Sequence, residues 1–340
     1  MTAVTPDNVD ELDRELEKLA IEGYWKLGPH APRNPPEAWL WRWQDVRPNL
    51  LAASKLVSLD GGSERRSLRL CTPNMSWKTT TETLTAAIQM VLPGEIAPAH
   101  RHSAAAIRFI IEGEGGYTTV EGERYRMSPA DLILTPQFTW HDHGNLSDAP
   151  VVWFDVLDVP LLRKLNSMTV ETYNAPVQEV VREDGHGRRA LGPVRAAGLS
   201  PRRGGNPFHY SGAEALAALR DGALSGEDPF DGATVEYRNP LTGGPTQPTH
   251  QCRLHRLAAG QTTRRHRHNW NTIYHVVEGQ GETVAGNKTL SWSAHDTFSL
   301  PSWLWHSHCA RGNHDAILFS VSDEPVYEAF ALDRMEIAAS

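Results

Sequence analysis

Residues 98–115 read PAHRHSAAAIRFIIEGEG, and residues 264–281 read RRHRHNWNTIYHVVEGQG. The two stretches lie 166 positions apart, and both place an EGxG segment shortly after an HRH triplet. A second pair, TWHDH at residues 139–143 and LWHSH at residues 304–308, repeats at an offset of 165. Similarity at a nearly fixed offset is the signature of a repeated unit. The chain is therefore predicted to contain two copies of one domain.

Each copy has the composition of an antiparallel β-domain. Short β-prone runs, such as AIRFII, YTTV, DLILT and VVWFDVL in the first copy, alternate with glycine and proline turns. We expect an all-β protein of two antiparallel barrels with a few flanking helices. The predicted ranges are 1–74 for an N-terminal helix (within residues 7–22) and a Trp/Pro-rich arm, 75–160 for the first barrel, 161–245 for a connector with a short helix, 246–325 for the second barrel and 326–340 for a tail.

Charge and cysteine content argue against several classes of function. The chain has 33 Lys and Arg against 41 Asp and Glu, with no basic stripe to neutralise phosphates, so nucleic acid is not an expected partner. Three cysteines without CxxC spacing indicate neither a disulfide framework nor a thiolate metal site. The acidic N-terminus lacks the apolar run of a signal peptide, and no stretch approaches the ~18 apolar residues of a membrane span. We therefore expect a cytoplasmic protein without membrane contact.

Histidines gather in two windows of the chain. Of the 16 histidines, 13 lie within residues 100–143 or 250–314. Residues i and i+2 of a strand share one face, so each HRH triplet can direct two imidazoles at one ion, and a third can come from a distant strand. A lone HRH triplet is more often a chance surface pair, but the second copy and the glycine, proline and asparagine spacing argue against that reading. The predicted metal ligands are His100, His102 and His141 in the first copy, and His266, His268 and His306 in the second.

These motifs closely resemble the two motifs of the cupin superfamily. Cupins commonly add a glutamate three or four residues after HxH, but those positions hold Ala106 and Ile107 in the first copy, and Thr272 and Ile273 in the second. Three neutral imidazoles leave about three positions of an octahedral ion open and preserve its charge. Such a site suits Fe(II) that binds a chelating anion together with dioxygen. The missing carboxylate argues against oxalate-type bicupins.

Longer stretches resemble one family. The segments PEAWLWRWQDVRPNL (36–50), GGSERRSLRLCTPNM (61–75) and TPQFTWHDHGN (135–145) are similar to the gentisate 1,2-dioxygenase family, which includes salicylate and 1-hydroxy-2-naphthoate dioxygenases. The resemblance implies a bicupin fold, usually a homotetramer, with Fe(II) in the N-terminal cupin. It also implies that O2 cleaves the ring bond between the carboxyl-bearing carbon and its ortho hydroxyl-bearing carbon. For gentisate the product would be maleylpyruvate.

The same resemblance implies residues for substrate binding and catalysis. By position in the matched motifs these are Gln89, Arg108, His143 and Asp155, with Arg65 or Arg66 reaching the substrate carboxylate. Arginine can bind a carboxylate through two hydrogen bonds, and His143 shares a strand face with His141. A His143–Asp155 pair would orient the imidazole for proton transfer. A solvated charge at Arg108 and a packing role for Asp155 are the alternatives.

The second copy keeps the three histidines but differs around them. Arg108 corresponds to Tyr274, Gln89 to His255 and Asn145 to Ala310. We therefore expect a second divalent ion with a structural role and no catalysis. Salicylate, 5-substituted salicylates and 1-hydroxy-2-naphthoate remain alternatives to gentisate. A bicupin that binds a metal or small ligand without oxidation is the alternative of another class.

Overall fold

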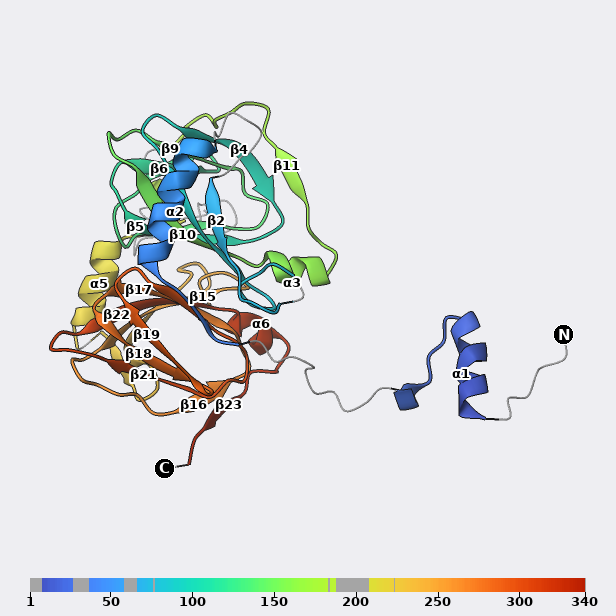
Figure 1. Cartoon of the computed structure of the whole chain (residues 1–340). Coiled ribbons are helices and arrows are strands. Elements are labelled where there is room, and N and C mark those ends of the chain that lie inside the picture. The colour runs from blue at the N-terminus through green and yellow to red at the C-terminus, as the bar shows by residue number, and fades with distance from the viewer. Residues whose placement is uncertain are drawn as a thin grey trace. The chain divides into compact units, whose positions relative to one another are not determined.

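The computed structural model describes residues 8–26, 37–57, 66–75, 77–182, 184–187, 208–222 and 224–339. The chain divides into two units, Met1–Pro35 and Pro36–Ser340 (Figure 1). In the smaller unit, helix α1 (Val9–Lys18) begins after Asn8, whose side chain accepts a hydrogen bond from the backbone N–H of Glu11. A single 3-10 turn, η1 (Tyr24–Lys26), follows.

The first barrel of the larger unit consists of two antiparallel sheets. Their strand orders are β12-β8-β5-β10-β3-β2 and β11-β4-β9-β6-β7. The strands are β2 (Ser67–Leu70), β3 (Thr85–Val91), β4 (Ile96–His102), β5 (Ala106–Glu112), β6 (Gly116–Val120), β7 (Glu123–Arg126), β8 (Leu132–Thr135), β9 (His141–Asn145), β10 (Val151–Leu157), β11 (Val170–Thr172) and β12 (His209–Tyr210).

The second barrel repeats this architecture. Its strand orders are β1-β20-β17-β22-β15-β14-β13 and β19-β18-β21-β16-β23. The strands are β1 (Trp39–Trp41), β13 (Gly226–Asp228), β14 (Gly232–Tyr237), β15 (Gln251–Leu257), β16 (His266–His268), β17 (Thr272–Glu278), β18 (Gln280–Ala285), β19 (Lys288–Ser293), β20 (Thr297–Leu300), β21 (His306–Ala310), β22 (Ala316–Ser322) and β23 (Met335–Ile337). The predicted all-β fold of two antiparallel barrels is confirmed.

The sheets extend beyond the barrel ranges expected from the sequence. Strand β1, from the Trp/Pro-rich arm, pairs with β20 of the second barrel, and β23, from the tail, pairs with β16. The connector gives β11 and β12 to the first barrel and β13 and β14 to the second. Apart from β14, these strands have two or three residues and lie at sheet edges, so their pairing depends on long-range contacts rather than on a local sequence pattern.

The repeated EG segments mark equivalent turns. Gly113 and Gly279 have φ angles of +90° and +83°, which L-residues with side chains rarely adopt. A Cβ atom would lie 2.5 Å from the Pro150 carbonyl oxygen at the first position and 2.6 Å from that of Asp315 at the second. Both turns therefore require glycine, which explains why this part of the repeat is so similar.

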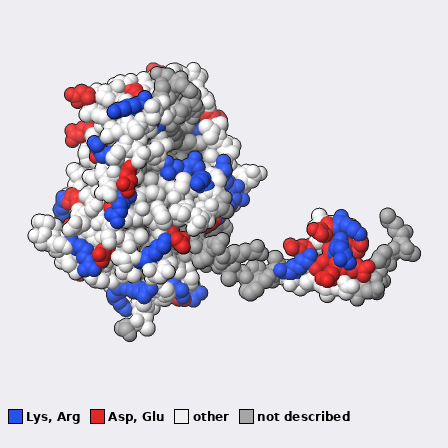
Figure 2. Space-filling view, viewed as in Figure 1, with Lys and Arg blue, Asp and Glu red and all other residues white. Residues whose placement is uncertain are grey.

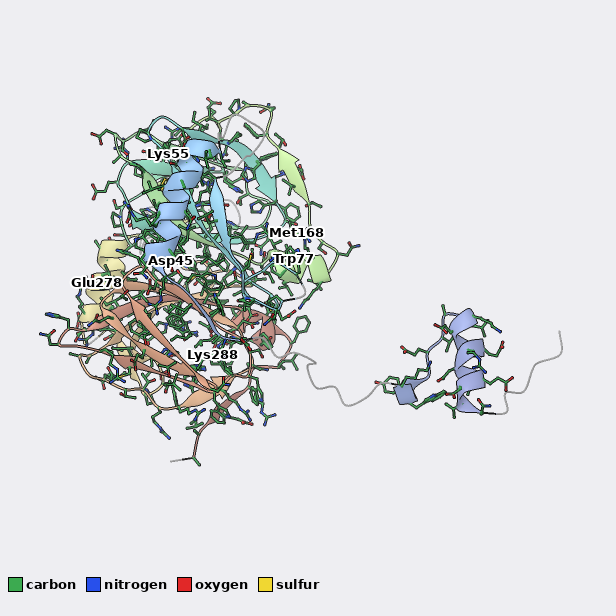
Figure 3. All side chains as sticks on the ribbon, viewed as in Figure 1. Asp45, Lys55, Trp77, Met168, Glu278 and Lys288 are labelled. Atoms are coloured by element: carbon green, nitrogen blue, oxygen red, sulfur yellow. The ribbon has the colours of Figure 1, made fainter. Side chains whose placement is uncertain are left out.

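The helices of the larger unit lie against the barrels (Figure 1). Helix α2 (Trp43–Leu56) packs Leu50 into the core of the first barrel, and α5 (Gly212–Arg220) is capped by Ser211, as its capping-box spacing predicts. Short helix α3 (Val159–Lys164) follows β10 of the first barrel, and α6 (Glu324–Ala329) follows β22 of the second. Figure 3 shows the Glu278 side chain beside α5, where it pairs with Arg220.

One apolar core runs from the first barrel into the second. The ring of Phe109 stacks on Phe319 with centroids 4.1 Å apart, and Phe154 stacks on His275 at 5.5 Å. The two barrels are therefore held by a buried aromatic contact. The outer face in Figure 2 carries interspersed acidic and basic side chains. Within the described ranges, every helix is too short or too polar to cross a membrane.

Candidate functional site

Each barrel brings three histidines together on its smaller sheet. In the first barrel, β4 supplies His100 and His102, and His141 of β9 lies directly opposite His100 in the strand register. Their ring centroids are 4.4, 4.8 and 5.6 Å apart. The ligand atoms of the three side chains all lie within 4.8 Å of one another. This grouping matches the triad expected from the HRH and WH motifs.

The second barrel contains the same arrangement. Strand β16 supplies His266 and His268, and His306 of β21 is the register partner of His266. The ring centroids are 4.1, 4.9 and 5.6 Å apart, close to the values of the first triad. The ligand atoms again lie within 4.8 Å of one another. The duplication has therefore preserved the geometry of the triad as well as its residue types.

All six rings are held in one tautomer by backbone carbonyls. The Nδ1 atoms hydrogen-bond the carbonyl oxygens of Pro98, Ala104, Thr139, Arg264, Trp270 and Leu304. A carbonyl oxygen only accepts, so each Nδ1 carries the proton and each Nε2 keeps its lone pair for a ligand bond. Burial also lowers the pKa of His268 to about 3, which keeps this imidazole neutral at pH 7.

The donor set of both triads fits a divalent transition metal. The Nε2 atom of His306 is buried and has no hydrogen-bond partner among the described residues. A buried polar atom without a partner costs free energy unless an ion or water occupies the site. Three neutral nitrogen ligands with fixed tautomers are the arrangement that imidazole-binding ions such as Fe(II) require.

Gln89 lies on the wall of the first barrel that faces the triad. It belongs to β3 and is the register partner of Trp153 in β10, whose ring lies 5.7 Å from that of His143. The Gln89 side chain is 1% exposed, and neither amide atom has a hydrogen-bond partner in the part of the chain that the structure describes. An amide with both ends unsatisfied inside a barrel indicates a place where a polar ligand binds.

Arg108 and Asp155 form a buried ion pair, so the expected His143–Asp155 pair is wrong. Asp155 is the register partner of Arg108, and the Arg108 Nε atom lies 3.0 Å from its Oδ1. The other carboxylate oxygen accepts a hydrogen bond from the Trp153 indole at 2.9 Å. The Arg108 and Asp155 side chains are 1% and 3% exposed, so each buried charge is compensated by the other. The register of β5 against β10 places the two residues side by side.

His143 has a different partner. It follows His141 on the same face of β9, with ring centroids 5.5 Å apart, and its Nδ1 lies 2.9 Å from the hydroxyl oxygen of Thr118. The second barrel repeats the contact, because Thr283 lies 2.9 Å from Nδ1 of His308. Neither threonine was expected from the sequence, although the offset of 165 that relates the WH motifs also relates these two residues.

Arg66 is committed to a contact within the protein. Its guanidinium forms two hydrogen bonds with the Glu95 carboxylate, at 2.7 and 2.8 Å, and also bonds the Val57 carbonyl. The Arg66 side chain is only 2% exposed. The expectation that Arg66 reaches the substrate carboxylate is therefore corrected, because Glu95 already neutralises it. Arg65, the other candidate, lies outside the described residues.

The pocket beside the second triad is acidic. A cavity of about 400 Å³ is lined by both β16 histidines and by several carboxylates. Arg253 pairs with Glu236 and Glu324, and Asp228 and Asp231 belong to the same lining. Burial raises the pKa of Asp231 to about 7. The similarity between the two copies gave no indication of these two aspartates, because they precede β14 and lie outside the repeated motifs.

In the second barrel, the residues at the positions of Gln89 and Arg108 have partners within the protein. His255, at the position of Gln89, lies 2.7 Å from the Ser320 hydroxyl and 3.1 Å from that of Thr234. Tyr274, at the position of Arg108, stacks on Phe298 with centroids 4.9 Å apart. The second pocket thus has no counterpart of the unsatisfied Gln89 amide.

Comparisons with known proteins agree with this geometry. Residues 87–157 and 253–322 match the cupin domain family. The chain is 39% identical to a 5-aminosalicylate 1,2-dioxygenase of Comamonas sp, over 98% of this chain and 91% of that protein. It is 37% identical to gentisate 1,2 dioxygenase 1 of Aquipseudomonas alcaligenes, over 94% of each chain.

Solved structures give the same picture. A salicylate 1,2-dioxygenase from Pseudoaminobacter salicylatoxidans, studied as adducts with gentisate, superposes with a TM-score of 0.88 at 30% identity. The match covers 100% of this chain and 97% of that one. The similarity therefore includes both barrels.

Proposed function

The chain belongs to the family of gentisate 1,2-dioxygenases and their salicylate and 1-hydroxy-2-naphthoate relatives, and from this membership we propose that it cleaves the ring of gentisate with O2. The bond broken would join the carboxyl-bearing carbon to the ortho hydroxyl-bearing carbon, with maleylpyruvate as the product. The unsatisfied amide of Gln89 on the wall facing the first triad carries this proposal, because it marks where a polar substrate fits.

The first triad is proposed to hold Fe(II). His100, His102 and His141 would supply three nitrogen ligands and leave positions for the carboxylate and hydroxyl of one substrate and for O2. The ion would provide a common binding point through which an electron-rich ring and O2 can exchange electrons. The Nδ1 hydrogen bonds to the backbone fix the three rings before the ion binds, so little reorganisation accompanies loading.

The surrounding side chains are proposed to orient the substrate. His143 would exchange a proton with the substrate hydroxyl through Nε2, because Thr118 holds its Nδ1. Gln89 would hydrogen-bond the ring substituents. Arg108 would face the substrate with its charge partly balanced by Asp155, which fixes the guanidinium rather than the imidazole. Arg65 is the remaining candidate for the substrate carboxylate.

The second triad is proposed to bind a divalent ion without catalysis. His266, His268 and His306 reproduce the ligand geometry. However, Tyr274 stands at the position of Arg108, and Ser320, at the offset of 165, stands at that of Asp155, so the second barrel has no equivalent of this ion pair. The acidic lining of this cavity, which includes Glu227 and Asp228, would repel an anionic hydroxy acid. This ion would therefore stabilise the barrel. By the same family resemblance we propose a homotetramer located in the cytoplasm.

The experiment that tests the function is oxygen uptake by protein loaded anaerobically with Fe(II). The panel contains gentisate, salicylate, 5-aminosalicylate and 1-hydroxy-2-naphthoate, with the His141→Ala variant as the control. We expect gentisate to give the highest kcat/KM. A higher value for a 5-substituted salicylate would transfer the assignment to that substrate. Iron bound without oxygen uptake on any member of the panel would support the non-oxidative bicupin instead.

A further inference from the structure

One metal-ligand histidine in each barrel is connected to a buried aspartate through a single peptide group. In the first barrel, the Ala104 carbonyl accepts the Nδ1 hydrogen bond of His102 at 2.7 Å. The N–H at the other end of this peptide, on Ala105, donates to Oδ1 of Asp158 at 2.9 Å. A carboxylate that accepts from the N–H polarises the peptide and strengthens its carbonyl as an acceptor, which orients the imidazole more firmly.

The second barrel repeats this connection. His268 donates from Nδ1 to the Trp270 carbonyl at 2.9 Å, and the Asn271 N–H donates to Oδ1 of Asp323 at 2.7 Å. Neither aspartate is exposed to solvent. Asp158 lies between β10 and α3, and Asp323 lies between β22 and α6.

Each aspartate is held by a threonine of the opposite barrel. Thr249, just before β15, donates to Oδ2 of Asp158 at 2.7 Å. Thr83, just before β3, donates to Oδ2 of Asp323. The two contacts are equivalent, because the threonines lie 166 positions apart and the aspartates 165. They cross the boundary between the barrels in opposite directions.

We propose that Asp158 and Asp323 are positioning residues for the two metal centres, and that Thr249 and Thr83 make each centre depend on the opposite barrel. This inference rests on the proposed metal binding by the triads. A threonine that fixes Oδ2 sets the direction of Oδ1, which sets the peptide and, through it, the imidazole. The affinity of each triad for its ion should therefore respond to a substitution in the other half of the chain.

The two connections differ in strength. The Asn271 side chain bonds Oδ2 of Asp323 at 2.9 Å and the Thr83 hydroxyl at 3.0 Å, whereas the equivalent residue in the first barrel is Ala105. Loss of Thr83 is thus partly compensated, and loss of Thr249 is not. The first barrel has a second contact of this kind. His141 donates from Nδ1 to the Thr139 carbonyl, and the N–H of the same peptide, on Trp140, donates to the exposed Glu121 carboxylate. Glu121 lies within its own barrel, so it does not transmit the effect of Thr249.

The test measures metal affinity one site at a time. In a His306→Ala background, only the first triad is complete, and chelator competition gives its Kd for Fe(II) or Co(II). We expect Thr249→Val to weaken binding roughly tenfold, as is usual for a partner behind a metal ligand, and Thr83→Val to leave it unchanged. In a His141→Ala background, Thr83→Val should weaken the second triad, by less than tenfold, and Thr249→Val should not.

Further variants separate positioning from general loss of stability. Thr249→Ser keeps the hydroxyl and should restore both the Kd and the Co(II) absorption spectrum of the first site. Equal weakening by both valine variants in both backgrounds would indicate a loosened fold and overturn the inference, as would an unchanged Kd for Thr249→Val. Absence of metal from the unsubstituted chain would instead overturn the proposed metal binding, and the inference with it.

Discussion

The two barrels hold nearly the same histidine triad in different surroundings. In the first, Arg108 and Asp155 place opposite charges on the wall of the barrel, and the Gln89 amide has no partner among the described residues. In the second, His255 and Ser320 bond one another at 2.7 Å, and the nearby cavity is acidic. A triad has therefore survived duplication while the residues around it have changed. On the proposed function, the wall opposite the metal ligands distinguishes the catalytic barrel from the other one.

The largest expected effect separates the two triads. His102→Ala should remove the ion of the first site and abolish turnover, because two imidazoles leave the ion held mainly by water. Its matched control, His268→Ala, should lower the melting temperature and the metal content while turnover per iron at the first site is kept. Metal analysis, thermal unfolding and oxygen uptake check both variants. Complete loss of turnover in His268→Ala would make the second triad catalytic or tightly coupled to the first.

Transplanting the wall of the second barrel into the first should remove catalysis but keep the ion. Arg108→Tyr combined with Asp155→Ser should lower kcat/KM by roughly 100-fold or more, because the substrate loses its orienting groups. Asp155→Ser alone should cost about 3–5 kcal/mol of unfolding free energy, since it leaves a buried guanidinium uncompensated, and the double variant should cost less. Urea unfolding and metal content check this. Metal loss in the double variant would instead connect the ion pair to the ligands.

The contrast between Gln89 and His255 can be tested at equivalent positions. Gln89→Leu should lower kcat/KM about 10–100-fold, the worth of a hydrogen bond to a charged substrate, and should raise stability by about 1 kcal/mol because an unsatisfied amide is removed. His255→Leu should instead lower stability, since Ser320 and Thr234 lose their hydrogen-bond partner. Steady-state kinetics and unfolding measurements decide the matter. A destabilised Gln89→Leu protein with normal kinetics would make Gln89 a structural residue.

The smallest expected effect is one that the two barrels share. Burial raises the pKa of Asp158 and of Asp323 to about 6. A folded-state pKa above the unfolded value of about 3.8 gives stability that is complete at low pH and is lost as the pH rises through 6. Between pH 5.5 and 7.5 each carboxyl should cost roughly 1 kcal/mol of unfolding free energy.

Metal-free protein is used to measure this pH dependence, because ligand protonation would otherwise add to it. Asp158→Asn and Asp323→Asn keep the size of the side chain and remove its titration, although the amide nitrogen cannot accept the hydrogen bonds of Oδ2. Each variant should therefore flatten the curve by a similar amount. A curve that is unchanged in both asparagine variants would assign the pH dependence to other groups.

The fold and the grouping of the histidines followed from the sequence because both depend on local patterns. The repeat revealed two copies, and the two-residue period of a strand placed His100 beside His102. The partner of Asp155 could not be found in this way, since it is set by the register of β10 against β5. The partner of Arg66 could not be found for a similar reason. Its partner Glu95 lies 29 positions away, beyond any short spacing rule.

Strand β1 also has a consequence for how the chain is synthesised. Trp39 pairs with Ser299, so the outer strand of the second barrel leaves the ribosome 260 residues before its partner. At a synthesis rate of about 5–20 residues per second, β20 is synthesised roughly 13–50 s after β1. The first barrel can close during this interval, whereas a fragment that begins at β13 would expose β20 as a sheet edge open to other chains. Gene fragments that begin between the barrels should therefore aggregate through the exposed edge of β20.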